Sequence, residues 1–381
     1  MSDAAAIVLI LAVIYLIDCL HFLHRNAVAW TAWFKSECRA LFAGASFGSR
    51  SAGVFLSPLL PPLGSTFVTQ LLPVSFSPLG VCSFIASALT PAGRPPQIAR
   101  VFRYEEIERL SADMRDVLIN GERFVQCRSE RVARHVADAI RRLVKVAPED
   151  RESLLQTLAA EAFNASDARA VVAAFRTSTR ALRILCNLEW FWIFVIFPGV
   201  LLAAGLSFLL LFLALGLLVL HTAIMVIYWR LHRAVLPQET YNRVEGMLKM
   251  ALCPPASVRA VDLISLDLLD LHHPLSAAAA LAAPAERQRL ALLLLREARH
   301  PLPLPAAPPD LGAIADWHRT TTLRAAEAFL NTEGVDLSAL ERPPEPRDPA
   351  ERTFCPRCHT TYTLETGTCP DCSGILLEKL K

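Results

Sequence analysis

The stretch that decides the fold is WFWIFVIFPGVLLAAGLSFLLLFLALGLLVLHTAIMVIYW, which occupies residues 190–229 and contains no charged residue. Its forty residues exceed one membrane crossing, which takes about 20 apolar residues, and they fit two. The sequence therefore predicts a transmembrane helical hairpin over 189–229, with helices of about 189–204 and 207–229. Pro198 lies too close to the start to end a full crossing, so we interpret it as a kink.

A second apolar stretch, residues 4–23, contains a single charge, Asp18. Its length of about 20 residues also suffices for one crossing. A cleaved signal peptide is the alternative, and Ala27-Val28-Ala29 resembles a cleavage site. However, the basic segment that normally precedes the apolar part of a signal peptide is missing. We therefore expect residues 1–24 to form a retained transmembrane anchor, which makes three transmembrane helices in all.

The composition agrees with a protein that is only partly embedded in a membrane. Of the 381 residues, 53% are hydrophobic and 19% are charged, whereas soluble proteins have roughly 25% charged residues. This excludes a disordered chain, a coiled coil and an ordinary soluble enzyme. The net charge of +2 predicts no field that would attract nucleic acid. Only five of the 38 basic residues are Lys, which favours a GC-rich, bacterial genome.

Basic residues beside the apolar stretches predict the orientation in the membrane. They follow the first stretch, precede the second and follow the third, as Arg25, Lys35 and Arg39, then Arg176, Arg180 and Arg183, then Arg230 and Arg233. Because positive residues stay inside, we expect the N-terminus outside the bacterial inner membrane and the C-terminus in the cytoplasm. Arg176, Arg180 and Arg183 are also candidates for contact with anionic lipid headgroups, at roughly 1 kcal/mol each. An ordinary positive flank is the simpler interpretation.

Two ionisable residues stand out within the apolar stretches, Asp18 in the first and His221 in the last. Counted from Arg25 and Arg230 at 1.5 Å per residue, they lie about 10 and 13 Å below the same cytoplasmic border. A charge at that depth is costly unless it is paired, so an Asp18–His221 contact is one hypothesis. The alternative is that Asp18 reaches the border alone and His221 packs as a neutral side chain.

Residues 25–146 are expected to form a small cytoplasmic α+β domain. Its segment 51–93 carries no charge, but prolines interrupt it every few residues. Proline removes a backbone donor and distorts a helix, so this segment predicts short strands, such as 66–69 and 74–76, instead of a crossing. These strands are either buried in the domain or in contact with the membrane surface.

The end of this domain carries two local signals. Asn120-Gly121 between short apolar runs predicts a β-hairpin with a type I′ turn. Ser129 then predicts the start of a helix that reaches about residue 146. Apolar side chains fall on one face of that helix, as Val132, Val136, Ile140 and Leu143. Residues 147–188 are expected to form helices that lead back to the membrane.

The segment 230–340 is rich in Leu and Ala and is cut by prolines, which predicts a cytoplasmic helical region. The expected helices cover about 238–252, 257–271, 275–283, 285–299 and 310–331. Acidic and histidine side chains in this region are interpreted as a solvated helix face and a helix end, although they could also be imagined as a metal cluster (Asp262, Asp267, Asp270, His272 and His273). The charged, proline-rich segment 341–352 predicts a stiff, solvated linker that separates the last unit from the rest.

The strongest chemical motif lies in the last unit, residues 353–381. Cys355-Pro356-Arg357-Cys358 is followed after ten residues by Cys369-Pro370-Asp371-Cys372. Two C-x-x-C pairs supply four thiolates, and four soft sulfur ligands in a tetrahedron suit Zn²⁺. Such a short unit cannot build a core, so the metal would supply most of its folding energy.

These two knuckles resemble the zinc-ribbon family, and their Cys-Pro-x-Cys pattern also resembles rubredoxin. The zinc-ribbon resemblance implies a structural metal and a role in docking proteins or nucleic acid. The rubredoxin resemblance implies iron and electron transfer as the alternative. The family often has Gly after the second Cys of each knuckle, where this chain has His359 and Ser373. His359 is an alternative ligand in place of Cys358.

Together these features predict a mainly α membrane protein with three transmembrane helices, a small cytoplasmic α+β domain, a cytoplasmic helical region and a C-terminal zinc ribbon. No phosphate-binding loop, nucleophile elbow or H-E-x-x-H motif is found in the sequence. The expected function is a membrane-anchored adaptor or assembly scaffold that binds the lipid bilayer and a protein partner. The charges around the ribbon are mixed, which makes nucleic acid a poorer partner. The alternative is a membrane enzyme or transporter that uses Asp18 and His221 at the cytoplasmic border.

Overall fold

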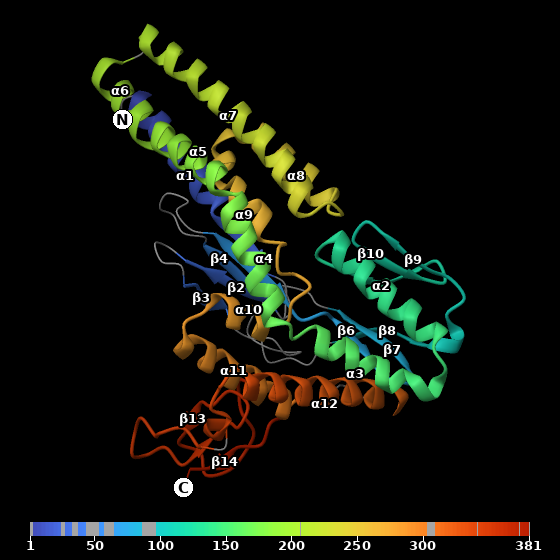
Figure 1. The fold of residues 1–381 in the computed structure, drawn as a ribbon. Coiled ribbons are helices and arrows are strands. Elements are labelled where there is room, and N and C mark those ends of the chain that lie inside the picture. Colours follow the sequence, from blue (N-terminus) through green and yellow to red (C-terminus); the bar gives the residue numbers. More distant parts are fainter. Residues whose placement is uncertain are drawn as a thin grey trace.

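The computed structural model describes residues 3–23, 27–32, 37–42, 53–56, 65–85, 97–205, 207–302, 309–340, 342–372 and 374–380. Helices dominate, and the described strands form sheets of two or three strands. The apolar helices of residues 3–18 and 180–235 lie at one end of the molecule, most of the sheets and the other helices lie in the middle, and the last strands lie at the opposite end (Figure 1). The expected helix-rich chain with small sheets is confirmed.

The predicted hairpin consists of two helical stretches that are long and apolar enough to cross a membrane. The first has 25 residues and the second 28. The first is built from α5 (Arg180–Phe191), a π-helical turn (Trp192–Ile196) and α6 (Phe197–Ala204), and the second is α7 (Phe208–Val235). The π turn directly precedes Pro198, whose missing N–H removes one helical hydrogen bond. Gly205 ends α6 with a φ of 64°, a conformation that glycine adopts without strain.

The first helix is shorter than the sequence predicts. Helix α1 (Asp3–Asp18) has 16 residues, which span about 24 Å against a hydrocarbon core of about 30 Å. The chain then turns into strand β1 (Leu20–Leu23), which pairs antiparallel with β4 (Gly53–Leu56). A third full crossing is therefore not confirmed. The physical reason is that residues 20–23 pair with the distant β4 instead of continuing the helix. The buried Asp18 carboxylate lies 2.6 Å from the ammonium of Lys249 at the point where α1 ends.

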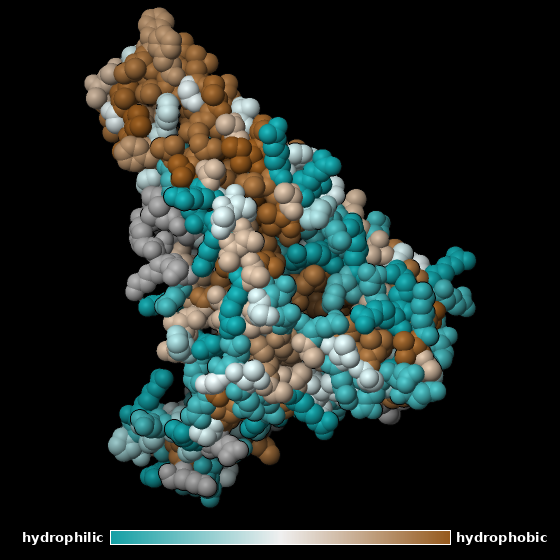
Figure 2. Space-filling model, in the orientation of Figure 1, coloured by the Kyte–Doolittle hydropathy of each residue, from teal (hydrophilic) through white to brown (hydrophobic). Residues whose placement is uncertain are grey.

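Helices α1, α5–α6 and α7 lie side by side and expose apolar side chains (Figure 1). The exposed fraction is 57% for Ile10, 68% for Phe212 and 71% for Val219. Hydrophobic atoms cover this end of the molecule in Figure 2, whereas hydrophilic atoms dominate elsewhere on the same face. A contiguous apolar surface of this kind is unfavourable in water and marks contact with a membrane or a partner.

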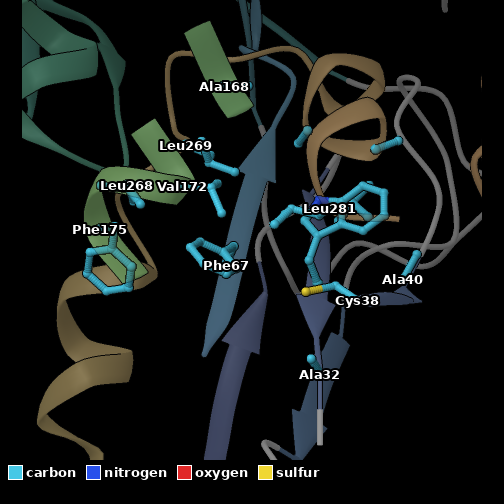
Figure 3. Packing of buried hydrophobic residues seen from close by; sticks show 14 of the residues in the cluster. Ala32, Cys38, Ala40, Phe67, Ala168, Val172, Phe175, Leu268, Leu269 and Leu281 are labelled. Carbon is cyan, nitrogen blue, oxygen red and sulfur yellow. The ribbon is translucent and has the colours of Figure 1, made fainter. Parts of the chain in front are cut away.

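The larger core joins a small sheet to the central helices. Strand β2 (Ala27–Thr31) pairs antiparallel with β3 (Arg39–Phe42) and β5 (Thr66–Gln70). Around this sheet lie α4 (Ala165–Ser178), α8 (Tyr241–Leu252), a 3-10 helix (Pro254–Arg259), α9 (Ala260–Ser265), α10 (Pro274–Leu281) and α11 (Pro284–Arg299). The buried side chains shown in Figure 3, among them Phe67, Phe175 and Leu281, come from both the sheet and the helices. This core therefore crosses the expected boundary between residues 25–146 and 230–340.

A second core forms around two sheets and helix α2 (Glu130–Lys145). The sheets are β6 (Val74–Phe76), β7 (Gly80–Ile85) and β8 (Gln97–Arg103), and β9 (Leu110–Asp113), β10 (Asp116–Ile119) and β11 (Glu122–Gln126). The predicted Asn120-Gly121 turn is confirmed, with φ values of 53° and 83°. Ser129 caps α2 by accepting a hydrogen bond from the Val132 N–H, and the four predicted apolar side chains of α2 are buried.

Two segments that are far apart in the sequence, the start of α2 and the start of α8, provide caps for each other. The Glu239 carboxylate accepts hydrogen bonds from the N–H groups of Glu130 and Arg131, at 3.1 and 2.6 Å. In return, the Glu130 carboxylate accepts a 2.8 Å hydrogen bond from the N–H of Tyr241, the first residue of α8. The first N–H groups of a helix have no partner within it, and a carboxylate there also interacts favourably with the helix dipole. This reciprocal capping fixes α2 to the segment that follows the long apolar helix α7.

The acidic residues that follow α9 contribute to the same polar contact between the starts of α2 and α8, which we call the joint. Asp270 accepts a 3.0 Å hydrogen bond from Nε of Arg131 and is bonded to the Ser129 hydroxyl. Asp267 accepts hydrogen bonds from Arg128 and Asn242, at 3.3 and 2.7 Å. Both carboxylates are buried, so the expected solvated helix face is wrong. The sequence-based interpretation missed their arginine partners because these lie about 140 residues away in the chain.

The joint predicts a pH dependence of stability. Burial raises the pKa of Glu239 to about 7, and the nearby Asp270 and Asp267 carboxylates also raise it, although the N–H groups of Arg131 and Glu130 oppose the shift. Between pH 5 and 7 the folded protein therefore binds more protons than the unfolded chain. The contribution of Glu239 to the free energy of unfolding then falls as the pH rises.

We expect Glu239→Gln to reduce this loss of unfolding free energy between pH 5 and 7 by roughly 1–2 kcal/mol, allowing for solvent screening. Denaturant unfolding in mild detergent at pH 5, 6 and 7 measures it. The exposed Glu149→Gln variant is the control and should keep the wild-type profile. Identical pH profiles for Glu239→Gln and the wild type would contradict the prediction.

Candidate metal centre

The four predicted cysteine ligands come together at one point. The Sγ atoms of Cys355, Cys358, Cys369 and Cys372 all lie within 4.8 Å of one another. The Cys358 and Cys369 sulfurs are 3.8 Å apart. A tetrahedral site with Zn–S bonds of about 2.3 Å has edges of about 3.8 Å between sulfurs. The four thiols therefore lie close to the arrangement that a tetrahedral metal ion needs.

Three short strands hold the two knuckles. Strand β12 (Thr353–Phe354) pairs antiparallel with β13 (Thr361–Tyr362) and β14 (Glu378–Lys379). Each knuckle needs a residue with positive φ to reverse the chain, which explains why related ribbons often carry Gly there. Here His359 takes this conformation in the first knuckle, with a φ of 60°, and Gly374 takes it in the second, with a φ of 82°. Ser373 lies outside the described residues.

Polar hydrogens around the sulfurs favour the thiolate form that a metal requires. The Cys372 N–H donates to the Cys369 sulfur at 3.3 Å. The Tyr362 hydroxyl lies 3.1 Å from the same sulfur and 3.2 Å from the Asp371 carboxylate. Four thiolates complete a closed shell, which suits a structural metal better than a catalytic one.

The cysteine module is docked onto helix α11 through Arg357. Its side chain is buried, with an exposed fraction of 2%, and it donates hydrogen bonds to the carbonyl oxygens of Glu297 and His300, at 2.8 and 2.7 Å. These carbonyls end α11 and have no partner within the helix, so the guanidinium acts as a C-terminal cap. Leu302 adds apolar contact with the buried cysteines.

This docking corrects the expected separation of the last unit. Residues 341–352 connect the module to the rest, but they do not hold it apart, because Arg357 inserts between the two knuckles and α11. The sequence offers no local signal for this contact. An Arg inside a C-x-x-C motif normally looks like a surface charge, and its partners lie about 60 residues earlier.

The two ionisable residues of the apolar stretches are not bonded to each other. Asp18 is paired with Lys249, as described above. His221 lies on α7, with Nδ1 3.2 Å from the Glu189 carboxylate and 3.0 Å from the Ser257 hydroxyl. The Ser257 hydroxyl also donates to Glu189 at 2.6 Å. Glu189 is the last charge before the apolar stretch and Ser257 lies near the Pro254-Pro255 break, so sequence reasoning did not connect them to His221.

The three arginines before the hairpin have different surroundings. Arg180 is exposed, whereas Arg176 and Arg183 are half-buried. The Arg183 guanidinium donates to the Ser65 hydroxyl at 3.2 Å. Arg176 lies close enough to the Cys38 thiol to affect its pKa. Contact with lipid headgroups stays a prediction for these residues, and Arg180 is the one whose side chain is most accessible for it.

Comparison with known proteins gives no relative, because no family model, no curated protein and no solved structure matches the chain. The class of protein is therefore defined by the structure alone. It is a helix-rich protein with two helices able to cross a membrane and a four-cysteine cluster that can hold a metal ion.

The cluster predicts that purified protein binds a single zinc ion per chain. Cys369→Ser removes one of four ligands and should abolish stoichiometric zinc, because the remaining shell is incomplete. Cys253→Ser, a half-buried thiol outside the cluster, should leave the zinc content unchanged. Elemental analysis of both variants tests this. Stoichiometric iron in the wild type, or zinc that survives Cys369→Ser, would contradict it.

The docking contact predicts a separate effect of Arg357. Arg357→Ala should retain zinc but free the module from α11, at a cost of about 1–3 kcal/mol for the lost charge-assisted hydrogen bonds. Limited proteolysis should then cut the 341–352 segment faster, as followed by mass spectrometry. The exposed Arg352→Ala variant should be cut at the wild-type rate. Equal cleavage of both variants would show that Arg357 does not hold the module.

Proposed function

We propose that the protein is a membrane-anchored adaptor or assembly scaffold whose zinc ribbon is the docking head for a protein partner. The observation that carries this proposal is the position of the two features. The exposed apolar helices lie at one end of the molecule and the cysteine module at the opposite end (Figure 1, Figure 2). An anchor at one end would hold the docking module well away from the bilayer surface.

The positions of the apolar helix ends, and of the basic residues near them, support one orientation of the protein in the membrane. The start of α1 and the turn between α6 and α7 lie at the same end of the molecule (Figure 1). Basic residues lie at the other ends of these helices, with Arg180 and Arg183 at the start of α5 and Arg230 and Arg233 near the end of α7. Under the positive-inside rule, the start of α1 and the turn would face outward and the ribbon would lie in the cytoplasm of a bacterium. Helix α1 would enter the bilayer beside the hairpin.

The ribbon offers apolar side chains to a partner. Leu364 and Leu376 are exposed, with fractions of 49% and 71%. Large exposed apolar residues on such a small module favour contact with another protein. The surrounding charges are of both signs, so a surface for nucleic acid phosphates is not favoured. Because Arg357 docks the module on α11, the partner would be held at a fixed place relative to the membrane helices.

The alternative of an enzyme or transporter would need free ionisable groups at the membrane border. Asp18 is paired with Lys249, and His221 with Glu189 and Ser257. Groups that already satisfy each other in buried positions favour a structural role, in which they hold α1 and α7 to the helices below them.

Photo-crosslinking in native membranes tests the proposal at three exposed leucines. A photoreactive residue replaces Leu215 on α7, Leu376 on the ribbon or Leu79 between β6 and β7. We expect lipid adducts from position 215, a discrete protein adduct from 376, and neither from the control at 79. The protein adduct should disappear in the Cys369→Ser background.

Each part of the proposal can fail separately in this experiment. Absence of lipid adducts from position 215 would refute the anchor. Absence of a protein adduct from 376, or the same adduct from 79, would refute the docking role of the ribbon.

A further inference from the structure

The middle of the molecule contains a cavity of about 540 Å³, and among the described residues that line it are none of the four cysteines and no residue of α1, α5–α6 or α7. It lies between α3 (Arg151–Glu161), α11, α12 (Pro309–Thr332) and the β6 region, and α3 and α12 are in contact. Most of its lining side chains are apolar, as with Leu155, Phe163, Leu295, Trp317 and Leu323. Cavities of 300–1,000 Å³ with such a lining are typical of sites for small organic ligands.

Two histidines provide polar groups in the wall of this largely apolar cavity. His273 and His318 both line it, and each lies deep in the protein yet keeps accessible surface toward the cavity. The Nδ1 atom of His273 accepts a 3.2 Å hydrogen bond from the Leu275 N–H. The Nδ1 atom of His318 accepts a 3.3 Å hydrogen bond from the Phe76 N–H. A neutral histidine that accepts at Nδ1 carries its proton at Nε2, so each ring has one further donor to offer.

Both rings are neutral at physiological pH. Burial lowers the pKa of His273 to about 3 and that of His318 to about 4, and the nearby His318 ring further lowers the pKa of His273. Each of the three acidic residues in the lining is paired with an arginine, Asp270 with Arg131, Glu297 with Arg357 and Asp316 with Arg319. The two histidines therefore offer uncharged hydrogen-bond donors beside the apolar part of the cavity wall.

We propose that this cavity binds a single-chain acyl lipid, whose carbonyl oxygen accepts hydrogen bonds from Nε2 of His273 and His318 while its hydrocarbon chain fills the apolar space between α3 and α12. A carbonyl oxygen has two acceptor positions and suits two neighbouring donors. A chain buried here removes apolar surface from water at both the ligand and the lining. The exposed lining residues His135 and Asp316 mark where the cavity meets solvent.

A photoreactive palmitic acid analogue, with a diazirine on the chain, tests the site in the full-length protein. After irradiation in mild detergent, labelled peptides are mapped by mass spectrometry. We expect labels on α3 and α12 that excess palmitic acid or methyl palmitate removes and hexadecane, which has no carbonyl, does not. Labels on α1, α5–α6 and α7 report non-specific contact with the membrane helices and serve as the internal reference for intact protein.

Two sets of variants separate the cavity from the surface. Ala159→Phe fills the space beside α3 and should abolish the α3 and α12 labels while the membrane-helix labels stay. Ala173→Phe, at an exposed position of α4 outside the lining, is the matched control and should change neither. The double variant His273→Leu and His318→Leu should weaken competition by palmitic acid roughly tenfold or more, because two hydrogen bonds are lost.

The outcomes decide between the alternatives. Labels confined to the membrane helices would refute the cavity as a lipid site. Labels on α3 and α12 that persist in Ala159→Phe would place the ligand elsewhere and overturn the proposal. Equal competition by hexadecane and palmitic acid, or unchanged competition in the double histidine variant, would refute the role of the two histidines. None of these results depends on the ribbon, so the test is independent of the proposed docking function.

Discussion

The arrangement of the molecule depends on the buried polar joint at the start of α2. Helices α2 and α8 belong to different parts of the chain, and each supplies a carboxylate to the other, Glu130 to the start of α8 and Glu239 to the start of α2. Asp267 and Asp270 surround the same point with further acceptors. Buried carboxylates are costly unless they are hydrogen-bonded or paired, so these groups are satisfied in only one relative position of the two helices. The joint thus fixes the sheet unit to the end of the long apolar helices.

Two further contacts that involve buried charges also connect separate elements. The ion pair of Asp18 with Lys249 lies at the end of α1 and connects it to α8. The guanidinium of Arg357 caps α11 and ties the cysteine module to the central helices. In each case a charge that could have been solvated is used to hold two elements together. The apolar cores supply most of the stabilisation, but these polar contacts determine which elements meet.

Local parts of the fold were predictable because their causes lie within a few residues. Asn120-Gly121 allows the positive φ angles of a tight hairpin, and Ser129 caps α2 through an N–H three residues later. The cysteine pairs are close in sequence, so their convergence within 4.8 Å also followed from spacing. The length of α1 did not follow, because the apolar stretch continues past Asp18 and residues 20–23 leave the helix to pair with the distant β4. The burial of Asp267 and Asp270 was missed for the same reason.

The sequence by itself determined where the apolar stretches lie, which four thiols come together, and where the short turns and caps occur, because each of these depends on neighbouring residues. Only the tertiary structure decided which buried charges are paired, where α1 ends, how the cysteine module rests on α11, and that a cavity with two histidines opens between α3 and α12. Those features join residues about 60 to 240 positions apart. Hydrophobic periodicity carries no information about which distant elements come into contact, because any apolar face can pack against any other.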